Sequence, residues 1–563
     1  MNSEVRQCQN CKQEFTIEPD DFAFYEKIKV PPPTWCPECR LQRRYSWRNE
    51  WHLMRKKDVH DKEIFSLFHQ DSPVKIMEVA EWYSDSWNPL QYGQDYDFSK
   101  PFFTQFKELL SRVPIMSRSL TKATNSDYSA NANDVKDIYL SFGMSFVENS
   151  AHSIWGGKSK DIFDCHLYNE SELCYDCVNI NNCYRTLYSV DCEGCSEAMF
   201  CKNCIGCNNC FGCVNLKNKS YCIFNEPYTK DEYIKKIKEL GTTSKNSVEE
   251  LRKKSAEFWI KFPNKYIHGR HNVDASGDYI YNSKNAKNCW RIIGGENVKY
   301  CQNFTIEPAK DSYDHSNFGQ ETELIYESLI VGAGAYNVAF SVYCYPSNSN
   351  LRYCIFCQNS SNLFGCISLR NKQYCILNKQ YTKEEYEALV PKIIEHMKSS
   401  GEYGEFFPME MSPMAYNESF AFEHFPLTKE EVEKKGLVWR DSKEKHFNIT
   451  MESTDVPDDI KDVDESITKE IIKCSHNGEC NHECAEVFRI TNQELQFYKK
   501  LNIPLPRICQ NCRHYSRFAL RNPSKLWHRK CMKPGCNNEF ETSYAPDRPE
   551  IVYCESCYNK EVA

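Results

Sequence analysis

The sequence lacks the marks of a membrane protein and of a secreted protein. Its 563 residues contain no run of about 18 apolar side chains, and a helix that crosses a bilayer needs about that many. The beginning, MNSEVRQCQNCKQEF, has no apolar signal-peptide core and enters a cysteine pair at once. We therefore expect a cytoplasmic protein with no membrane partner, in a reducing compartment where thiols bind metal or are buried rather than form disulfides.

Catalytic signatures are also lacking. The sequence has no P-loop glycine pattern, no Gly-x-Gly-x-x-Gly at a strand–helix junction, no His-Glu-x-x-His and no Gly-x-Ser-x-Gly. Isolated polar groups, His271 with Asp274 and Asp311 with Asp314 and His315, lie in turn-rich sequence and are interpreted as solvated loop residues. We predict no catalytic residues, which argues against an enzyme.

Cysteine, in contrast, is abundant. The 32 cysteines form three blocks: four between residues 8 and 39, nineteen between 165 and 375, and nine between 474 and 557. Two internal repeats organise these blocks. CKQEFTIEPDDFAFYEK, from Cys11, matches CAEVFRITNQELQFYKK, from Cys484, so one module occurs at both ends of the chain. CFGCVNLKNKSYCIFN, from Cys210, matches LFGCISLRNKQYCILN, from Leu363, and each copy leads into a helix through a Thr-x-x-Glu capping box.

The first copy of the middle repeat has a finer period of nine residues: CYDCVNINN, CYRTLYSVD, CEGCSEAMF, CKNCIGCNN, CFGCVNLKN. So short a unit cannot fold alone, and frequent Asn and Gly suit stacked strands and turns. We predict a β-solenoid with two units, about eighteen residues, per coil, and ladders of Asn and Cys along the stack. The run from Cys201 to Cys213 also fits an iron–sulfur cluster. The second copy replaces two of these cysteines by Ser360 and Leu363, which favours thiols that act as small buried apolar groups.

The predicted fold is multidomain and β-rich, mixed α+β, with zinc ribbons at both ends flanking a duplicated β-solenoid. The expected domains, in chain order, are a zinc ribbon with a basic tail (1–60), a mixed helical and loop segment (61–130), solenoid copy 1 (131–263) with a helical insertion (229–262), solenoid copy 2 (264–410) with a helix (383–399), a short helix and acidic linker (411–470), a second zinc ribbon (471–523) and a third (524–563).

Three sets of four cysteines have the spacing of closed tetrahedral zinc sites, so three Zn²⁺ ions are predicted as the cofactors. An iron of the rubredoxin type would use similar knuckles. His482 and Cys474 compete for the second set, whose first knuckle is irregular. The sets are Cys8, Cys11, Cys36 and Cys39; Cys480, Cys484, Cys509 and Cys512; and Cys531, Cys536, Cys554 and Cys557.

Basic side chains interleaved with aromatic ones follow the knuckles. Cations for phosphates and rings for base stacking indicate a nucleic-acid partner, RNA or DNA. The alternative is that the cations only offset the −2 charge of zinc bound by four thiolates. The candidate nucleic-acid-binding residues are Arg40, Arg43, Arg44, Arg48, Arg513, Arg517, Arg521, Lys525, Trp527, Arg529 and Lys530.

The terminal modules, with C-x2-C, a central FYEK or FYKK and then C-x2-C-R, resemble zinc-ribbon domains. The order of WCPECRLQRRYSWRNEW, YGQDYDFSKPFFTQF, FGCVNLKNKSYCIFN, RNPSKLWHRKC and YAPDRPEIVYCESCY resembles uncharacterised cysteine-rich proteins common in candidate-phyla bacteria. That family implies a further cysteine pair after the first basic segment, where this sequence reads RKKDVHDKEI from Arg55.

The leading hypothesis is therefore non-catalytic zinc-dependent binding or scaffolding of nucleic acid, with RNA favoured. A second is a protein-interaction scaffold that uses the solenoid faces, and a third is an intracellular enzyme with its site on the solenoid.

Overall fold

The predicted β-solenoid is present, and it advances in steps of three residues. The structure, a computed structural model, describes residues 2–441 and 447–562. In the stretch through Cys174, Cys177, Ile180 and Cys183, every third side chain is buried in the interior. The residue before each of the last three, Asp176, Asn179 and Asn182, has a left-handed φ of 50° to 53°. Asn and Asp tolerate that conformation better than most residues, which explains their frequency in the sequence.

Each turn of the solenoid holds four such steps. Val178 pairs with Val190 and Ile180 with Cys192, both in parallel register with an offset of twelve residues. The expected coil of about eighteen residues was therefore wrong. A nine-residue alignment spans three steps, so it superposes the buried cysteines without following the chain around a whole turn.

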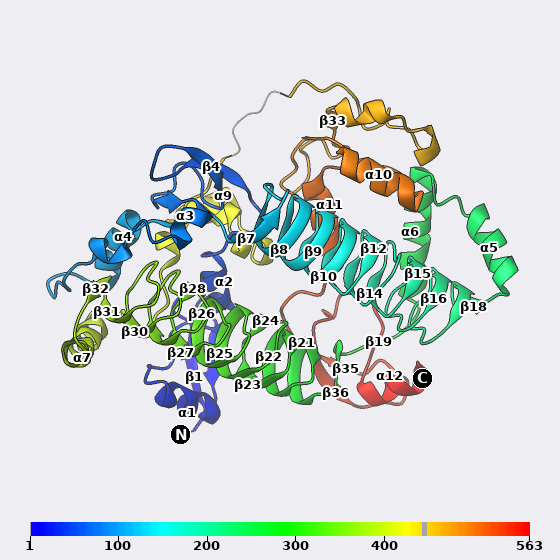
Figure 1. Cartoon of the computed structure of the whole chain (residues 1–563). Helices are drawn as coiled ribbons and strands as arrows, with labels where there is room; N and C mark the ends of the chain where they lie inside the picture. The colour runs from blue at the N-terminus through cyan, green and yellow to red at the C-terminus, as the bar shows by residue number, and fades with distance from the viewer. Residues whose placement is uncertain (1, 442–446, 563) are drawn as a thin grey trace.

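Two solenoids are formed, and they stack in opposite directions (Figure 1). Solenoid 1 runs from the centre of the view to β18, and solenoid 2 runs from the centre to β32. The first strand of solenoid 1 begins at Leu120, ahead of the predicted boundary at residue 131. The strands of solenoid 1 are β7 (Leu120–Thr124), β8 (Ser129–Tyr139), β9 (Ser141–Ala151), β10 (Ile154–Phe163), β11 (His166–Asn169), β12 (Glu172–Tyr175), β13 (Val178–Asn181), β14 (Val190–Glu193), β15 (Ser196–Met199), β16 (Asn208–Phe211), β17 (Ser220–Ile223) and β18 (Glu226–Pro227).

Solenoid 2 is less regular. Its turns take twelve residues near the end, where Ser349 pairs with Ser361, and thirteen earlier, where Tyr313 pairs with Tyr326. Its strands are β20 (Gly269–Arg270), β21 (Val273–Tyr281), β22 (Lys284–Ile293), β23 (Gly295–Lys299), β24 (Gln302–Phe304), β25 (Ala309–Phe318), β26 (Thr322–Val331), β27 (Tyr336–Ala339), β28 (Val342–Cys344), β29 (Ser349–Arg352), β30 (Ser361–Phe364), β31 (Gln373–Ile376) and β32 (Lys379–Gln380).

The predicted ladders also form. Asn169 donates to Asn181 at 3.1 Å, twelve residues on, and Asn350 donates to Asn362 at 3.2 Å. Inside, Cys192 Sγ donates to the Cys201 carbonyl at 3.6 Å and Cys201 Sγ donates to the Cys210 carbonyl at 3.5 Å. These thiols are buried small groups bonded to backbone, as expected of the interior of a narrow solenoid.

Both solenoids end in the same way, as the repeat predicted. An antiparallel pair, β17 with β18 or β31 with β32, closes the stack. A capping box then starts a helix, with Thr229 and Glu232 before α5 and Thr382 and Glu385 before α7. The helices of the chain are α1 (Pro19–Lys27), α2 (Pro37–Tyr45), α3 (Val79–Tyr83), α4 (Phe102–Arg112), α5 (Lys230–Glu239), α6 (Lys245–Trp259), α7 (Lys383–Ser399), α8 (Phe420–His424), α9 (Lys429–Lys434), α10 (Asn492–Leu501), α11 (Gln510–Phe518) and α12 (Glu555–Glu561).

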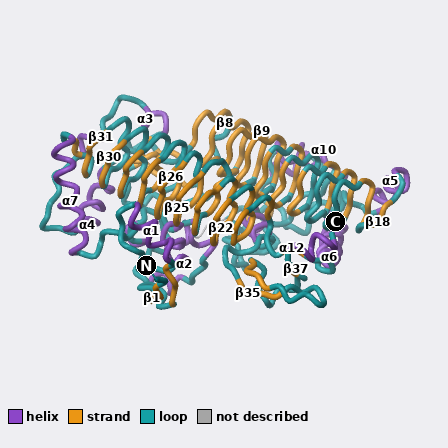
Figure 2. The backbone as a smooth tube through the Cα atoms, turned by 90° about the horizontal axis from the view of Figure 1, so that it is seen from below, coloured by secondary structure: helices purple, strands orange, loops and turns teal. Residues whose placement is uncertain are grey.

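Three terminal modules lie against the solenoids (Figure 2). Module 1 packs α2 against β25 and β26, and module 2 packs α11 against β11. Module 3 pairs its strand β37 with β19. The modules consist of β1 (Glu4–Gln7), β2 (Glu14–Ile17), α1 and α2; of β33 (Ile472–Lys473), β34 (Val487–Phe488), α10 and α11; and of β35 (Trp527–Lys530), β36 (Glu539–Thr542), β37 (Val552–Tyr553) and α12. The strand β19 is Asn264–Lys265.

The segment between module 1 and solenoid 1 contains both helices and strands. It contains, besides α3 and α4, the strands β3 (Met54–Lys57), β4 (Glu63–Ser66), β5 (Ile76–Met77) and β6 (Ile115–Met116). None of the helices in residues 2–441 and 447–562 combines the length and apolarity that a bilayer crossing requires.

Two sequence interpretations need correction. The acidic segment before module 2 is not a free linker from residue 447 on, because Val456, Ile460 and Val463 are buried and Asp458 accepts a hydrogen bond from Asn246 N at the start of α6. Residues 442–446 lie outside the described part of the chain. Asp314 and His315 are not solvated loop residues, since both are fully buried in β25.

The register change in β21 gives a test of the fold. The pairing offset rises from eleven, Val273 with Lys284, to twelve, Gly277 with Cys289. Gly277 has a φ of 130°, and a Cβ there would lie 1.7 Å from the Cys289 carbonyl oxygen. We expect Gly277→Ala to lower the free energy of unfolding by about 3 kcal/mol or more, measured by urea denaturation.

The matched control is Gly334→Ala in the same solenoid. Gly334 has a φ of 83°, but the nearest atom to its Cβ would be 3.9 Å away. The left-handed backbone alone should cost about 1–2 kcal/mol. Equal effects of the two substitutions would contradict the close approach at Gly277.

Candidate metal centres and module junctions

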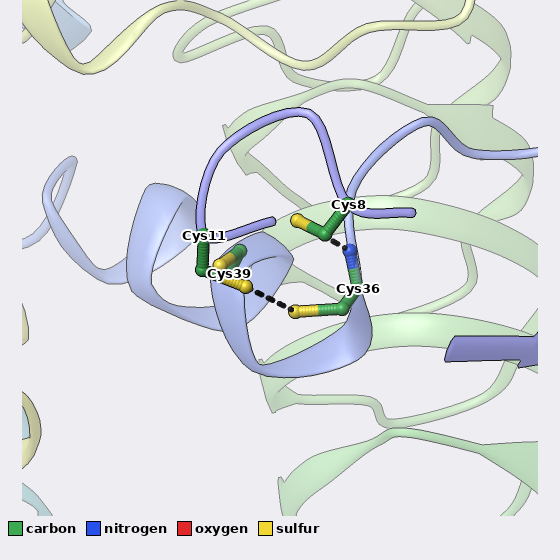
Figure 3. Close-up of side chains that lie close together, drawn as sticks. All are labelled: Cys8, Cys11, Cys36 and Cys39. Carbon is green, nitrogen blue, oxygen red and sulfur yellow. Dashed lines mark hydrogen bonds between the residues drawn. The ribbon is translucent and has the colours of Figure 1, made fainter. Parts of the chain in front are cut away.

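Each terminal module brings four cysteine sulfurs together from a hairpin and a helix start. In module 1, Cys8 and Cys11 lie on the β1–β2 turn, Cys36 is the N-cap of α2, and Cys39 lies in its first turn (Figure 3). Cys509 and Cys554 are likewise the N-caps of α11 and α12. A thiolate is stabilised at a helix N-terminus by the backbone N–H groups and the helix dipole.

The spacing of the sulfurs fits a tetrahedral metal. With metal–sulfur bonds of about 2.3 Å, two thiolates on one zinc lie about 3.8 Å apart. Cys11 Sγ lies 3.7 Å from Cys36 Sγ, and Cys536 Sγ lies 3.9 Å from Cys554 Sγ. These separations are far longer than a disulfide bond. The clusters can therefore hold metal ions.

The chemistry of the donors also suits a cation. A hydrogen bond from Cys39 lowers the pKa of the Cys36 thiol to about 5. Although burial opposes ionisation of Cys554, hydrogen bonds from Ser556 and Asn538 lower its pKa to about 6. The thiolates of Cys36 and Cys554 are thus favoured at neutral pH, whereas the pKa of Cys39 is raised, chiefly by its hydrogen bond with Cys36. The thiolate is the form that binds metal.

The second cluster differs from the predicted ligand set. Its four sulfurs belong to Cys474, Cys484, Cys509 and Cys512, so Cys474 takes the place given to Cys480. The backbone shows that Cys474 is the counterpart of Cys8 and Cys531. The first cysteine of each cluster accepts a hydrogen bond from the N-cap cysteine of the helix: Cys36 N to Cys8 at 3.2 Å, Cys509 N to Cys474 at 3.2 Å and Cys554 N to Cys531 at 3.3 Å.

The secondary structure of the three modules supports this assignment. In each module a short strand directly precedes the first ligand: β1 ends at Gln7, β33 at Lys473 and β35 at Lys530. Cys480 follows no strand. The spacing of the knuckles indicates Cys480, whereas the preceding strand indicates Cys474 as the counterpart of Cys8 and Cys531.

The basic residues of α2 and α11 meet carboxylates of the solenoids. Arg40 Nη2 lies 2.7 Å from Asp314 Oδ2, and Arg44 Nη1 lies 3.1 Å from Asp314 Oδ1. Their counterparts Arg513 and Arg517 contact the two oxygens of Asp164 in the same order. Both aspartates have a left-handed φ, 53° at Asp164 and 52° at Asp314, and their carboxylates contact the module arginines.

A stacked aromatic pair accompanies each ionic junction. Phe24 of α1 stacks on Tyr313, the residue before Asp314, with ring centroids 4.0 Å apart. Phe497 of α10, its counterpart, stacks on Phe163, the residue before Asp164, at 3.9 Å. The two junctions are therefore the same contact built twice.

Most of the cations predicted to bind nucleic acid are therefore buried. Arg40, Arg43, Arg44 and Arg48 are at most 6% exposed, as are Arg513 and Arg517. Arg43 pairs with Glu327 and Glu405, each at 2.7 Å, and Arg48 pairs with Glu50. A phosphate cannot approach these guanidinium groups without separating modules from solenoids. Nor do they mainly offset thiolate charge, because their partners are carboxylates.

The remaining candidates lie nearer the surface. Arg521 is half-buried and donates to His166 at 3.0 Å. Arg529 donates to the carbonyls of Tyr544 and Ala545. Lys530 is exposed but pairs with Glu539 at 3.0 Å. Lys525 is exposed, with its ammonium 5.7 Å from the ring centroid of Trp527.

Comparison with known proteins adds little. No protein-family model matches the chain, and no curated protein matches it. One similar solved structure is described as an acetyltransferase, provisionally assigned, from Desulfovibrio desulfuricans G20. It is 11% identical, with 48% of this chain and 69% of that chain covered, at a TM-score of 0.11. A likeness that weak carries no argument about fold or activity.

The junctions predict an asymmetry between buried and exposed pairs. Removing one charge of a buried pair costs about 3–5 kcal/mol, because the other is left uncompensated. Asp164→Asn should therefore lower the free energy of unfolding by about that amount and release module 2, measured by denaturation and limited proteolysis. Glu148→Gln is the control, since its pair with Lys136, at 3.2 Å, is largely exposed and should contribute at most about 1 kcal/mol. A mild effect of Asp164→Asn would show that the junction does not hold the module.

Metal removal should act locally. A chelator under reducing conditions should make amide hydrogen exchange about tenfold faster or more in the cysteine-bearing turns of modules 1 and 3. The strands β8, β9 and β10 should keep their protection, because backbone pairing within the solenoid needs no metal. Uniform loss of protection across the chain would refute this separation.

Proposed function

We propose that the protein is a non-catalytic, zinc-dependent scaffold in which the terminal modules hold two solenoids together and a solenoid face docks a protein partner. The observation that carries the proposal is the burial of the module arginines against Asp164 and Asp314. That burial supports a role of the terminal modules in holding the molecule together, whereas the sequence alone favoured nucleic-acid binding. Zinc is favoured as the metal because four thiolates in a closed tetrahedral set are its usual structural site.

The docking face we propose is a shallow groove on solenoid 1. It crosses β7 to β12 and is lined by Lys122, Asp134, Phe146, Lys158 and Glu170, which succeed one another at twelve-residue intervals. Lys122 pairs with Asp134 and Lys158 pairs with Glu170, each at 3.2 Å. Phe146 stands between these ion pairs and is 58% exposed.

This arrangement suits a protein more than a polyanion. The groove carries both signs of charge in alternation, so it offers no continuous positive field to a phosphate backbone. A large aromatic side chain ringed by polar groups is typical of the residues that dominate protein–protein binding energy. The expected partner presents an apolar pocket flanked by both acidic and basic groups.

A second candidate, nucleic-acid binding, is favoured by one pair of side chains in module 3. Exposed Lys525 beside Trp527 offers a cation and a ring together, which can contact a phosphate and a base of a single strand.

Partner capture with matched variants tests the scaffold. Tagged full-length protein should retain a partner that Phe146→Asp loses, with affinity reduced about tenfold or more. The control Val273→Asp changes an apolar residue of solenoid 2 that is 62% exposed and should bind like the parent. Equal binding by both variants would contradict the assigned face. Loss of binding after nuclease treatment, or in Lys525→Gln with Trp527→Ala, would instead support nucleic acid.

A further inference from the structure

Module 2 differs from the other modules in the loop between its first two ligands. Two residues separate Cys8 from Cys11 and four separate Cys531 from Cys536, but nine separate Cys474 from Cys484. The long loop carries three further metal-binding side chains, His476, Cys480 and His482. Since the four-sulfur set is complete without them, they need another explanation.

The loop folds these three side chains onto one sulfur of the cluster. The ligand atoms of His476, Cys480, His482 and Cys512 all lie within 4.8 Å of one another. Cys480 Sγ lies 3.6 Å from Cys512 Sγ, close to the separation of about 3.8 Å expected for two thiolates on one zinc. Cys512 thus belongs to two groups of four ligand atoms at once.

Each of the two histidines has a ring nitrogen that could bind a cation. The Nδ1 atoms of His476 and His482 are buried, and each lacks a hydrogen-bond partner within the described residues. A buried nitrogen without a partner costs free energy unless something binds it. The equivalent position in module 1 has no such pair; there Cys39 accepts a hydrogen bond from the Asn10 amide at 3.2 Å.

Contacts behind the loop hold its geometry. The His482 ring stacks on Tyr515 of α11, with centroids 5.6 Å apart and planes 9° from parallel. Tyr515 in turn donates to Glu483 Oε2 at 2.8 Å, and Asn511 donates to the Glu483 carbonyl at 2.7 Å. Supporting hydrogen bonds and packing of this kind orient the ligands of metal sites.

We propose that module 2 holds two divalent metal ions bridged by the thiolate of Cys512. The first ion is bound by Cys474, Cys484 and Cys509 together with the bridge. The second is bound by His476, Cys480 and His482 together with the same sulfur. Imidazole and thiolate donors select zinc or a similar borderline metal.

Charge favours the pair of ions. One divalent ion with four thiolates carries a net charge of −2. The second ion adds two positive charges, while only one more thiol, Cys480, must lose its proton, so the pair carries −1. The four metal ions per chain that follow exceed the three expected from cysteine spacing.

Native mass spectrometry of the reduced, zinc-loaded full-length protein tests the count. The parent should carry four zinc ions, and His476→Gln with His482→Gln should carry three while keeping its fold. His60→Gln with His528→Gln is the matched control, because both rings are exposed, and it should keep four. Three ions in the parent, or four in the His476 and His482 variant, would overturn the proposal.

Cobalt gives an independent readout of the bridge. Two cobalt(II) ions that share a thiolate couple magnetically, so the electron paramagnetic resonance intensity per cobalt should be reduced in the parent and restored in Cys480→Ser. Intensity that is proportional to cobalt content in both proteins would rule out the shared sulfur. If Cys480 instead replaces Cys474 around a single ion, the parent holds three ions and Cys480→Ser holds two.

Discussion

The architecture depends on one kind of contact, a pair of arginines from a helix clamped on a buried aspartate of a solenoid corner. Arg40 and Arg44 share Asp314, and Arg513 and Arg517 share Asp164. Such pairs add little net stability over apolar packing, but an unpaired buried charge is strongly unfavourable. The contact therefore acts mainly through specificity: a module that docked in another place would leave charges buried without partners.

The arginine–aspartate contacts also determine which solenoid each of modules 1 and 2 docks on. The N-terminal module docks on solenoid 2 and module 2 docks on solenoid 1, so each solenoid is held by the module more distant in sequence. The two solenoids that these modules contact run in opposite directions (Figure 1). Metal ions in the modules would fix the helix starts from which the arginines project, since Cys39 directly precedes Arg40 and Cys512 directly precedes Arg513. In each of these two modules, a candidate metal ligand is thus adjacent in the chain to an arginine that pairs with a solenoid aspartate.

The repeat within the solenoids shows why the period was misjudged. Burial and left-handed backbone both recur every third residue, so any multiple of three aligns cysteine with cysteine. Nine and twelve look alike in composition. Only the hydrogen bonds between turns, such as Val178 with Val190, define the length of a turn. The sequence indicates that the Asn and Asp residues at the corners form turns. Which of the aspartates pairs with an arginine depends on where a module docks.

Local chemistry was set by the sequence itself: the cysteine knuckles, the capping boxes at Thr229, Thr382 and Thr491, the stacked strands with buried thiols, and the duplication of both units. These follow from residues close together in the chain, whose conformational preferences do not require distant partners. The partners of the arginines and the choice of Cys474 over Cys480 were decided by tertiary structure alone. Each involves groups brought together from distant positions. Burial turns an apparent surface cation into half of an internal ion pair, and the position of a strand rather than the spacing of a motif determines which sulfur completes the four-sulfur cluster.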